Sequence, residues 1–375
     1  MTLHVLGLPH TVTSKLYSHC AFTGKVLRFV PMMRHLGYRI VHYGNGDSFD
    51  PHLCEHVSIM DRPELESYVG KYEPAGKGFI GTHARVDSPL YHQWNQRVRK
   101  ELDLRVQPLD IVCFPFGHAH EWAARNSKGV QGAYLVETGV GYTGKFCDFK
   151  VFESYAWLHW HHGHYQYDGS DYEWVIPNYF DVSEWKLNER KGQYVLFFGR
   201  ICDQKGMRIV VEMAKQPKDL RFVICGQGDP SPYLRESSNL EYFSPVLGEE
   251  RSRVLGDAIA VLCPSRYIEP FCGVAVEAML CGRPVLASHF GAFSEILPSH
   301  LLPWKLHLLR DWSSALRECE QFTENHFQGL REWAVSRYST EVIGRRYQRV
   351  FDQISGLAKG GWYGGQETTV SDSDP

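Results

Sequence analysis

The sequence lacks several features that would assign it to a specialised class of protein. Its ten cysteines are scattered and include no C-x-x-C pair, so we expect buried free thiols in a reducing cytoplasm. No run approaches the roughly 18 apolar residues of a membrane span, and no charged region precedes the apolar N-terminal segment, as a secretory signal would require. The net charge of −3 excludes a chain that is basic throughout.

Acidic residues are missing from the first 46 positions, since Asp47 is the first of them. The basic residues that precede it are Lys15, Lys25, Arg28, Arg34 and Arg39, and the histidines that precede it include His10, His19 and His35. Such a segment is locally electropositive. Either it faces an anionic partner, such as phospholipid headgroups or nucleic-acid phosphates, or it is a basic helix surface with acids opposite it in space.

The length of 375 residues predicts two domains, because a domain has roughly 100–200 residues. Hydrophobic residues make up 43% of the chain and charged residues 22%, ordinary values for a globular protein. The 19 histidines and the aromatic content of 13% are unusual. They are concentrated in the first half, notably in 155–180.

Apolar strands alternate with amphipathic helices along the chain, which predicts an α/β fold with parallel sheets. We expect strands at 3–8, 38–43, 109–116, 132–136, 174–176, 194–198, 220–225, 259–263 and 284–287, and helices at 24–36, 207–215, 251–255, 273–281 and 313–325. A polar connection, 181–193, separates the two series. The predicted units are a first Rossmann-like domain (1–185), a second (186–330), helices packing back toward the first domain (331–358) and a disordered tail (359–375). Ligands should bind in the cleft between the halves.

The strongest motif follows the strand 194–198. Gly199-Arg200 ends the strand, and Lys205-Gly206 follows before the next helix. Two cations flanked by glycines suit a diphosphate, because the glycines permit close backbone approach and the cations neutralise charge. A solvated surface loop is the alternative interpretation.

Two further motifs follow later strands of the second half. The first is Gly226-x-Gly228, which by itself is as typical of a simple turn. The second holds Glu269 and Glu277, separated by seven residues, with a loop-to-helix turn between them. Free N–H groups at that helix start, near 271–274, can hold anionic or hydroxylated ligands that the two glutamates would flank.

In this order the motifs resemble the donor-binding domain of the retaining GT-B glycosyltransferases, the large glycosyltransferase family 4. The matching residues are Gly199-Arg200, Lys205-Gly206, Gly226-x-Gly228, Pro264-Ser265, Glu269-Pro270-Phe271, Glu277-Ala278-Met279, Gly282 and Pro284-Val285. Val175-Ile176-Pro177-Asn178 is similar to the segment that closes the family's first domain. Cys272, between Phe271 and the glycine, and Tyr179 depart from the family pattern.

The resemblance implies a GT-B fold, in which two Rossmann-like domains with parallel sheets face each other across a cleft. It implies that Arg200 and Lys205 bind the diphosphate of a nucleotide-sugar and stabilise the leaving group, and that Glu269 contacts the transferred sugar. Glu277 would bind the ribose. The other donor-binding residues that it implies are Gly199, Gly226, Gly228, Val246, Leu247, Phe271, Cys272, Gly273 and Val274. No metal or other cofactor is expected, because the cations and the helix dipole replace the metal.

The acceptor side is less defined. The family places a histidine after the fifth strand of the first domain, where this chain has Glu137 and Gly139. We expect Glu137, His118 or His120 to contact sugar or acceptor, against the alternative of ordinary loop polarity. His10, in the loop after the first strand, should also line the cleft.

Trp157-Leu158-His159-Trp160-His161-His162-Gly163-His164-Tyr165 concentrates histidine and tryptophan. On a strand, His159 and His161 would share a face, and a transition-metal site would be conceivable. The other two interpretations are a packed or surface aromatic segment and an acceptor platform, because aromatic rings stack on sugars and bases.

The sequence therefore predicts a retaining, metal-independent hexosyltransferase that moves a sugar from a UDP- or GDP-sugar to a glycan, a lipid or a modified nucleic-acid base. We expect it in the cytoplasm, with peripheral association at an anionic surface left open. A nucleotide-sugar epimerase on the same fold and a non-catalytic nucleotide-sugar or glycan-binding protein are the alternatives.

Overall fold

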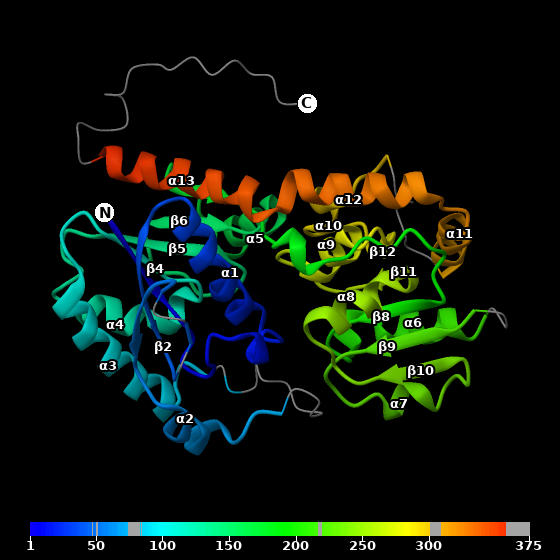
Figure 1. Ribbon diagram of the computed structural model, residues 1–375, viewed down its shortest axis with the longest axis horizontal. Coiled ribbons are helices and arrows are strands. Elements are labelled where there is room, and N and C mark those ends of the chain that lie inside the picture. The colour runs from blue at the N-terminus through cyan, green and yellow to red at the C-terminus, as the bar shows by residue number, and fades with distance from the viewer. Residues whose placement is uncertain are drawn as a thin grey trace, which may run out of the picture.

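The computed structural model describes residues 1–46, 48–49, 52–73, 83, 85–216, 220–300 and 309–357. Over these residues the chain forms two α/β domains that lie side by side, with two long C-terminal helices running along one side of both (Figure 1). The predicted tail, 359–375, lies outside the described residues.

The first domain is built on a seven-stranded sheet of order β3-β2-β1-β4-β5-β6-β7. All of its pairings are parallel. Its strands are β1 (Thr2–Leu6), β2 (Arg39–Gly44), β3 (Glu55–Ser58), β4 (Ile111–Cys113), β5 (Tyr134–Val140), β6 (Phe149–Phe152) and β7 (Glu173–Val175). The strand order reverses between β1 and β4, so the loops after these two strands diverge at the carboxyl edge of the sheet.

The second domain has a five-stranded parallel sheet of order β10-β9-β8-β11-β12. The strands are β8 (Tyr194–Phe198), β9 (Phe222–Cys225), β10 (Leu240–Phe243), β11 (Ala258–Cys263) and β12 (Val285–Ala287). Here the order reverses between β8 and β11. The predicted α/β class, with one parallel sheet in each of two domains, is confirmed.

Helices cover the sheets. In the first domain they are α1 (Ala21–His35), α2 (Arg62–Val69), α3 (Pro89–Arg105), α4 (Glu121–Asn126) and α5 (Tyr155–Tyr165), with the 3-10 turns η1 (Lys15–Tyr17) and η3 (Gly117–His120). Next come η4 (Val182–Glu184), η5 (Asp203–Lys205), α6 (Met207–Ala214), α7 (Ser231–Leu234), α8 (Gly248–Gly256), α9 (Gly273–Leu280) and α10 (Phe293–Ile296). The last are α11 (Leu309–Cys319), α12 (Glu324–Tyr338) and α13 (Thr340–Leu357). Several starts are capped by side chains: Asp61 caps α2, and Ser154 caps α5.

The final helix returns to the first domain. Ile343, Tyr347 and Phe351 of α13 are buried in the same core as β1 and α1, and the ring of Tyr347 packs edge-on against Phe29 of α1. The chain therefore crosses between the domains twice, at 176–193 and again where α12 meets α13 (Figure 1).

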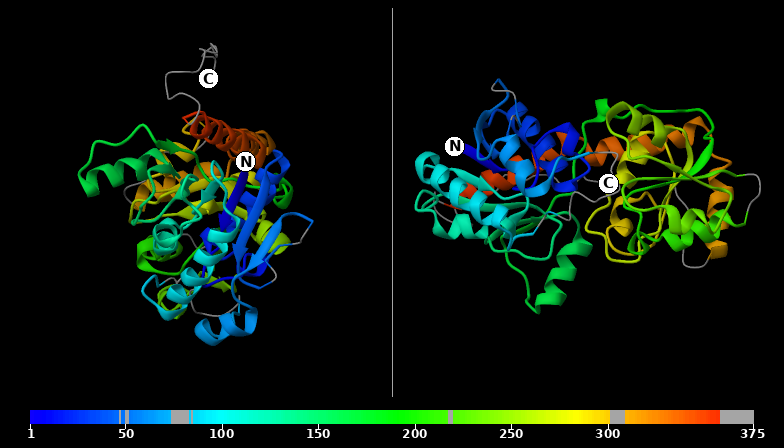
Figure 2. Two further views of the ribbon diagram at one scale, coloured as in Figure 1. Left: turned by 90° about the vertical axis from the view of Figure 1, so that its left-hand side faces the viewer. Right: turned by 90° about the horizontal axis from the view of Figure 1, so that it is seen from below.

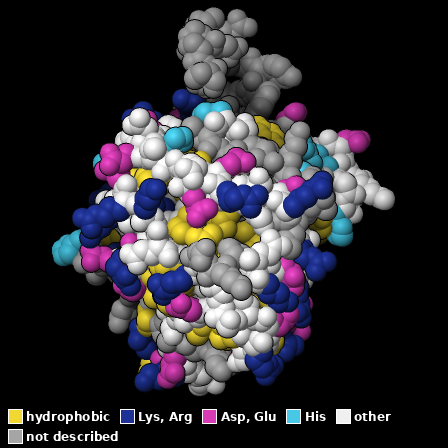
Figure 3. Space-filling view, turned by 90° about the vertical axis from the view of Figure 1, so that its right-hand side faces the viewer, with side chains coloured by type: hydrophobic (Ala, Val, Ile, Leu, Met, Phe, Trp, Pro, Cys, Tyr) yellow, Lys and Arg dark blue, Asp and Glu magenta, His cyan; other side chains and the backbone are white. Residues whose placement is uncertain are grey.

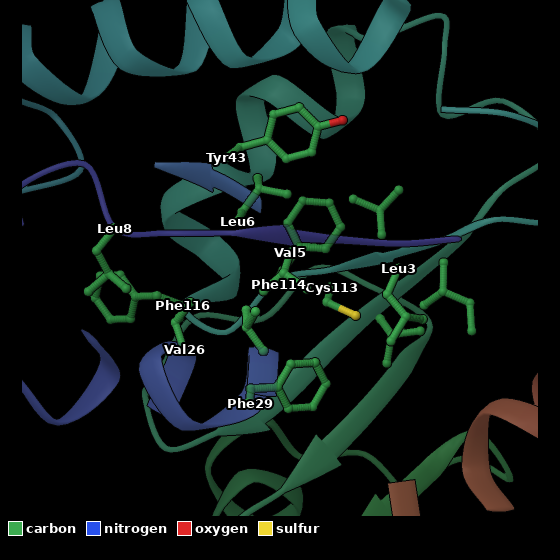
Figure 4. Close-up of a cluster of buried hydrophobic side chains, with 14 of the residues drawn as sticks. Leu3, Val5, Leu6, Leu8, Val26, Phe29, Tyr43, Cys113, Phe114 and Phe116 are labelled. Atoms are coloured by element: carbon green, nitrogen blue, oxygen red, sulfur yellow. The ribbon is translucent and has the colours of Figure 1, made fainter. Parts of the chain in front are cut away.

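Each sheet has its own hydrophobic core. Figure 4 shows side chains of β1 and β4, such as Val5 and Cys113, packing among those of α1, Val26 and Phe29. On the second sheet, Leu196 and Val261 face one cluster of buried side chains, and their neighbours on the strands face another. Because both faces of these parallel strands are buried, the strands read in the sequence as continuous apolar runs.

The structure differs from the sequence prediction at several elements of the first domain. The strand expected at 132–136 runs on to Val140, and β3, β6 and the helices α2 and α3 were not expected. The segment 157–165, for which a strand was considered, is helical within α5, which projects from the body of the first domain (Figure 2).

On the end face of the second domain, basic and acidic side chains surround a small hydrophobic patch (Figure 3).

Candidate functional site

A cleft of about 1420 Å³ lies between the two domains. Its second-domain wall is formed at the carboxyl edge of the sheet, by the segments that follow β8, β9 and β11 and by the start of α9. Its first-domain wall includes much of α1 and the residue that follows β6, Glu153. The switch point between β8 and β11 thus opens into the cleft, as expected for a ligand site in this class of sheet.

The most tightly built part of the cleft is the pair Lys205–Glu269. The Lys205 ammonium lies 2.5 Å from Oε1 of Glu269 and over the ring of Tyr267. Burial lowers the pKa of Lys205, but the Glu269 carboxylate and the Tyr267 phenol raise it by more, so this pKa lies above its ordinary value. The lysine is therefore a fixed positive charge facing the cleft.

Glu269 is almost fully buried and is held by three groups. Ser265 Oγ donates a hydrogen bond of 2.5 Å to Oε1, beside Lys205, and Tyr267 OH donates one of 2.7 Å to Oε2. A carboxylate held from both oxygens has a defined orientation, and it keeps lone pairs free to accept hydroxyl hydrogen bonds from a ligand.

Gly206 and Gly226 lie where two backbone segments approach each other so closely that a side chain would not fit. A Cβ on Gly206 would overlap the carbonyl oxygen of Pro264, and one on Gly226 would overlap the carbonyl oxygen of Gly199. Gly206 also has φ of 84°, in the left-handed region. The loops after β8, β9 and β11 are thus packed directly against one another, which brings Arg200 and Lys205 to one edge. Arg200 is exposed in the cleft and has no acidic partner among the described residues.

Glu277, in α9, is held by an arginine that the motif analysis did not single out. Arg251 of α8 donates to Oε2 of Glu277 from both Nε, at 3.0 Å, and Nη2. The guanidinium of Arg251 also lies 4.6 Å from the centre of the Phe198 ring. No sequence signal pointed to Arg251, because it lies on an ordinary-looking surface helix and its partner Glu277 is 26 residues away in the chain.

Most of the donor-binding residues predicted from the resemblance line the cleft. Those that do are Gly199, Arg200, Lys205, Gly226, Leu247, Glu269, Phe271, Cys272, Gly273, Val274 and Glu277. Gly228 and Val246 are not among the lining residues. The free N–H groups at the start of α9, at Gly273 and Val274, therefore face the same space as Lys205 and Glu269.

The predicted acceptor-side residues do not line the cleft. His10 is buried with Nδ1 2.8 Å from Tyr91 OH, and His120 is buried beside Trp94. Burial lowers the pKa of each of these two histidines to about 3. His118 packs against Phe116 and Tyr142. An acceptor role for these histidines stays a prediction.

Glu137 lies inside β5 rather than at its end. Its carboxylate accepts hydrogen bonds from the backbone N–H groups of Phe146 and Cys147, both at 3.0 Å, and from Tyr142 OH at 3.1 Å. Burial raises the pKa of Glu137 to about 7. Gly139, two residues on, is covered by Lys25, whose Nζ donates to the Gly139 carbonyl at 2.7 Å. Neither residue lines the cleft.

The acid-free N-terminal segment supplies the first-domain wall instead. Its cleft-lining basic residues are Lys15, His19, Lys25, Arg28 and His35. Lys25 is buried in an ion pair with Glu153, and Lys15 lies 3.4 Å from Glu184. Acids therefore lie opposite two of its lysines, as the second interpretation of the segment expects, and an anionic partner stays a prediction. Arg28, over the Phe180 ring at 5.2 Å, has no acidic hydrogen-bond partner among the described residues.

The histidine- and tryptophan-rich segment forms α5. Its rings stack along the helix at three- and four-residue spacing, with Trp157 on Trp160 and Trp160 on His164, each with centroids 4.5 Å apart. His159 and His161 therefore do not share a strand face. Among the described residues, no group of three or more His, Cys, Asp or Glu side chains has an arrangement that would hold a metal ion.

Comparison with known proteins agrees with this geometry. Residues 192–303 match the sequence model of the glycosyl transferases group 1. An uncharacterized glycosyltransferase of Methanocaldococcus jannaschii is 32% identical over 34% of this chain and 37% of its own length. The phosphatidyl-myo-inositol mannosyltransferase of Mycobacterium tuberculosis is 27% identical over 48% of this chain and 54% of its own. The matched regions thus span about half or less of these relatives.

Solved structures match over the whole fold. Sucrose-phosphate synthase from Thermosynechococcus elongatus superposes with a TM-score of 0.73 at 13% identity, covering 94% of this chain and 99% of that one. HepE from Anabaena, in complex with UDP and glucose, gives 0.64 at 15% identity, with 94% and 99% covered. The predicted resemblance is confirmed: the fold is GT-B, and most of the second domain matches the sequence model of the glycosyl transferases group 1. Within the part of the chain that the structure describes, no helix has the length and apolar character to span a bilayer.

Proposed function

We propose that this protein is a retaining glycosyltransferase that transfers a sugar from a nucleotide-diphosphate sugar, without a metal ion, to an acceptor bound on the first-domain wall. The observation that carries the proposal is the grouping of Lys205, Glu269 and the start of α9 around one edge of the cleft. The motifs that supply this grouping lie within residues 192–303, which match the sequence model of the glycosyl transferases group 1. The UDP bound to a structural neighbour supports a uridine nucleotide as the first donor to test.

In the proposed reaction the diphosphate lies between Arg200 and Lys205. As the glycosidic bond of the donor breaks, negative charge develops on the departing diphosphate, and the two cations stabilise that charge. The N–H groups at the start of α9 add the positive end of a helix dipole to the same region. This is the work that a divalent cation would otherwise do, which is why we propose metal independence.

The two glutamates have separate roles in this scheme. Glu269, oriented by Ser265, Tyr267 and Lys205, accepts hydrogen bonds from hydroxyls of the transferred sugar. Glu277, held by Arg251, accepts from the ribose hydroxyls of the nucleotide. Retention of anomeric configuration would then result from attack of the acceptor on the donor face that the leaving diphosphate occupies.

The acceptor would bind on the first-domain wall, where Arg28 lines the cleft. This cation favours an acceptor with an anionic group, whether a lipid headgroup, a glycan or a nucleic acid. The relatives include enzymes that act on phosphatidyl-myo-inositol and on lipopolysaccharide, and these two acceptor classes are the first candidates.

Three measurements test the proposal. A nucleotide panel in a thermal-shift assay should show stabilisation by one nucleoside diphosphate above its monophosphate. Proton NMR of the product should show the anomeric configuration of the donor, and inversion would contradict the retaining mechanism. Addition of EDTA should leave the rate unchanged, and a loss restored by Mg²⁺ or Mn²⁺ would contradict metal independence.

The same experiments separate the alternatives. An epimerase would interconvert free nucleotide-sugars without an acceptor and without net release of nucleoside diphosphate. A binding protein would be stabilised by the nucleotide-sugar and release none.

A further inference from the structure

No step of the proposed reaction uses the thiol groups of two cysteines in the cleft. Cys263 is the last residue of β11, and Cys272 directly precedes α9; both line the cleft. Their sulfur atoms lie 4.0 Å apart. All ten cysteines are free thiols, and among the described residues this is the one contact between two cysteine sulfurs.

The backbone at Cys272 is unusual. It has φ of 82° and ψ of 78°, a left-handed conformation that glycine adopts readily and that is strained for a residue with a Cβ. Cys263, by contrast, is fixed within the sheet, paired with Ala287 of β12. Of the two, Cys272 is the more exposed to the cleft. The pair therefore has one anchored, buried thiol and one accessible thiol on a segment that can relax.

The contact with Cys272 and burial raise the pKa of the Cys263 thiol, while the Lys205 ammonium acts in the opposite direction. The thiolate is the nucleophile in thiol–disulfide exchange. The first attack is therefore assigned to the more exposed thiol, that of Cys272.

We propose that Cys263 and Cys272 form an oxidisable dithiol whose disulfide closes the donor site. The second half of this statement rests on the proposed function. A disulfide bond is about 2.05 Å long, so the sulfurs must approach by roughly 2 Å. Cys272 makes this movement, since Cys263 is held in β11. The adjoining N–H groups of Gly273 and Val274, which we propose contact the donor, are displaced with it.

The chemistry balances with a disulfide oxidant such as oxidised glutathione. The Cys272 thiolate attacks the glutathione disulfide, which forms a Cys272–glutathione mixed disulfide and releases one glutathione thiolate. Cys263 then attacks the Cys272 sulfur, and the second glutathione leaves. The protein loses two electrons and two protons, and oxidised glutathione becomes two molecules of reduced glutathione.

The test uses the full chain, reduced and then equilibrated with oxidised glutathione. Peptide mapping by mass spectrometry should show a link between Cys263 and Cys272 that dithiothreitol reverses. Affinity for UDP, measured by calorimetry, should fall at least tenfold on oxidation and recover on reduction.

The variants C263S and C272S should each lose the link. C272S should show the same UDP affinity before and after oxidant, whereas C263S, which lacks the resolving thiol, should keep a glutathione adduct on Cys272. C202S, which removes another partly exposed thiol, should keep both effects. Each affinity is compared between the oxidised and reduced forms of one variant, so a change in the reduced affinity does not confuse the result.

Absence of the link in the oxidised wild type, or a stable glutathione adduct on Cys272 alone, would overturn the dithiol. A link without loss of UDP affinity would overturn the closure of the donor site. If neither form bound any nucleotide, the proposed function would fail, while the mass spectrum would still decide whether the dithiol forms.

Discussion

The carboxylate of Glu295, in the second domain, accepts a hydrogen bond of 2.8 Å from the backbone N–H of Tyr155, the first residue of α5 in the first domain. The next N–H, that of Ala156, donates to the other carboxylate oxygen at 2.6 Å. An acidic side chain of one domain thus satisfies the start of a helix in the other, where N–H groups have no partner within the helix.

This contact should help to hold the two domains together. Glu295→Ala should favour the open arrangement of the domains, because a charge-assisted interaction at a helix N-terminus contributes about 1 kcal/mol, or roughly fivefold in the equilibrium. Small-angle scattering should show a larger radius of gyration for the variant without nucleotide, and contraction when nucleotide is added. Glu318→Ala, an exposed residue of α11, is the control. Equal radii for Glu295→Ala and wild type would show that the contact does not hold the domains together.

Arg251 should support both the fold and nucleotide binding. Arg251→Ala leaves the buried carboxylate of Glu277 without its cation, and we expect about 2 kcal/mol lower stability and at least tenfold weaker UDP binding. Arg253→Ala is a matched control on the same helix, because Arg253 is exposed and pairs with Glu250; its effect should stay within about 0.5 kcal/mol. Urea unfolding and calorimetry measure the two quantities, and indistinguishable results for the two variants would contradict the role of Arg251.

The buried carboxyl group of Glu137 should make the free energy of unfolding depend on pH. Burial raises the pKa of Glu137 from 4.5 to about 7, so between these values the folded protein keeps a proton that the unfolded chain has lost. Glu137 therefore lowers the free energy of unfolding as the pH rises from 4.5 to 7, by about 3 kcal/mol in total.

Comparison with a variant isolates this effect from other groups that titrate. Urea unfolding of wild type and Glu137→Gln at pH 5 and pH 8 should show a gain in relative stability for the variant at pH 8. Glu318→Gln should show no such gain. A constant difference between Glu137→Gln and wild type at both pH values would contradict the raised pKa.

The second domain was predictable because its chemistry follows its strands. In that half, the apolar strands β8, β9 and β11 are followed by the segments that carry the motif residues. The observed strand Tyr194–Phe198 coincides with the predicted one. Parallel strands end at one edge, so Arg200, Lys205 and Glu269 were expected to converge, and they lie on one wall of the cleft.

The first domain was harder to predict because its strand ends were misplaced. With the strand expected to end at Val136, Glu137 was assigned to the cleft; since β5 runs to Val140, that side chain is buried in the domain. The unexpected strand β6 instead delivers Glu153 to the cleft. The helix α5 was also missed, because its start depends on Ser154 and on Glu295, which is 140 residues away.

The most direct test of the account is the rate of nucleoside diphosphate release from nucleotide-sugars, with and without acceptor, by wild type and Lys205→Ala. The wild type should release the diphosphate of one donor. Lys205→Ala should release it about 100- to 1000-fold more slowly, as expected when one group that stabilises developing charge is lost. Lys215→Ala, whose side chain lies on the surface near Glu212, should match wild type. A Lys205→Ala variant that is folded by circular dichroism and releases the diphosphate at the wild-type rate would contradict the proposed donor site.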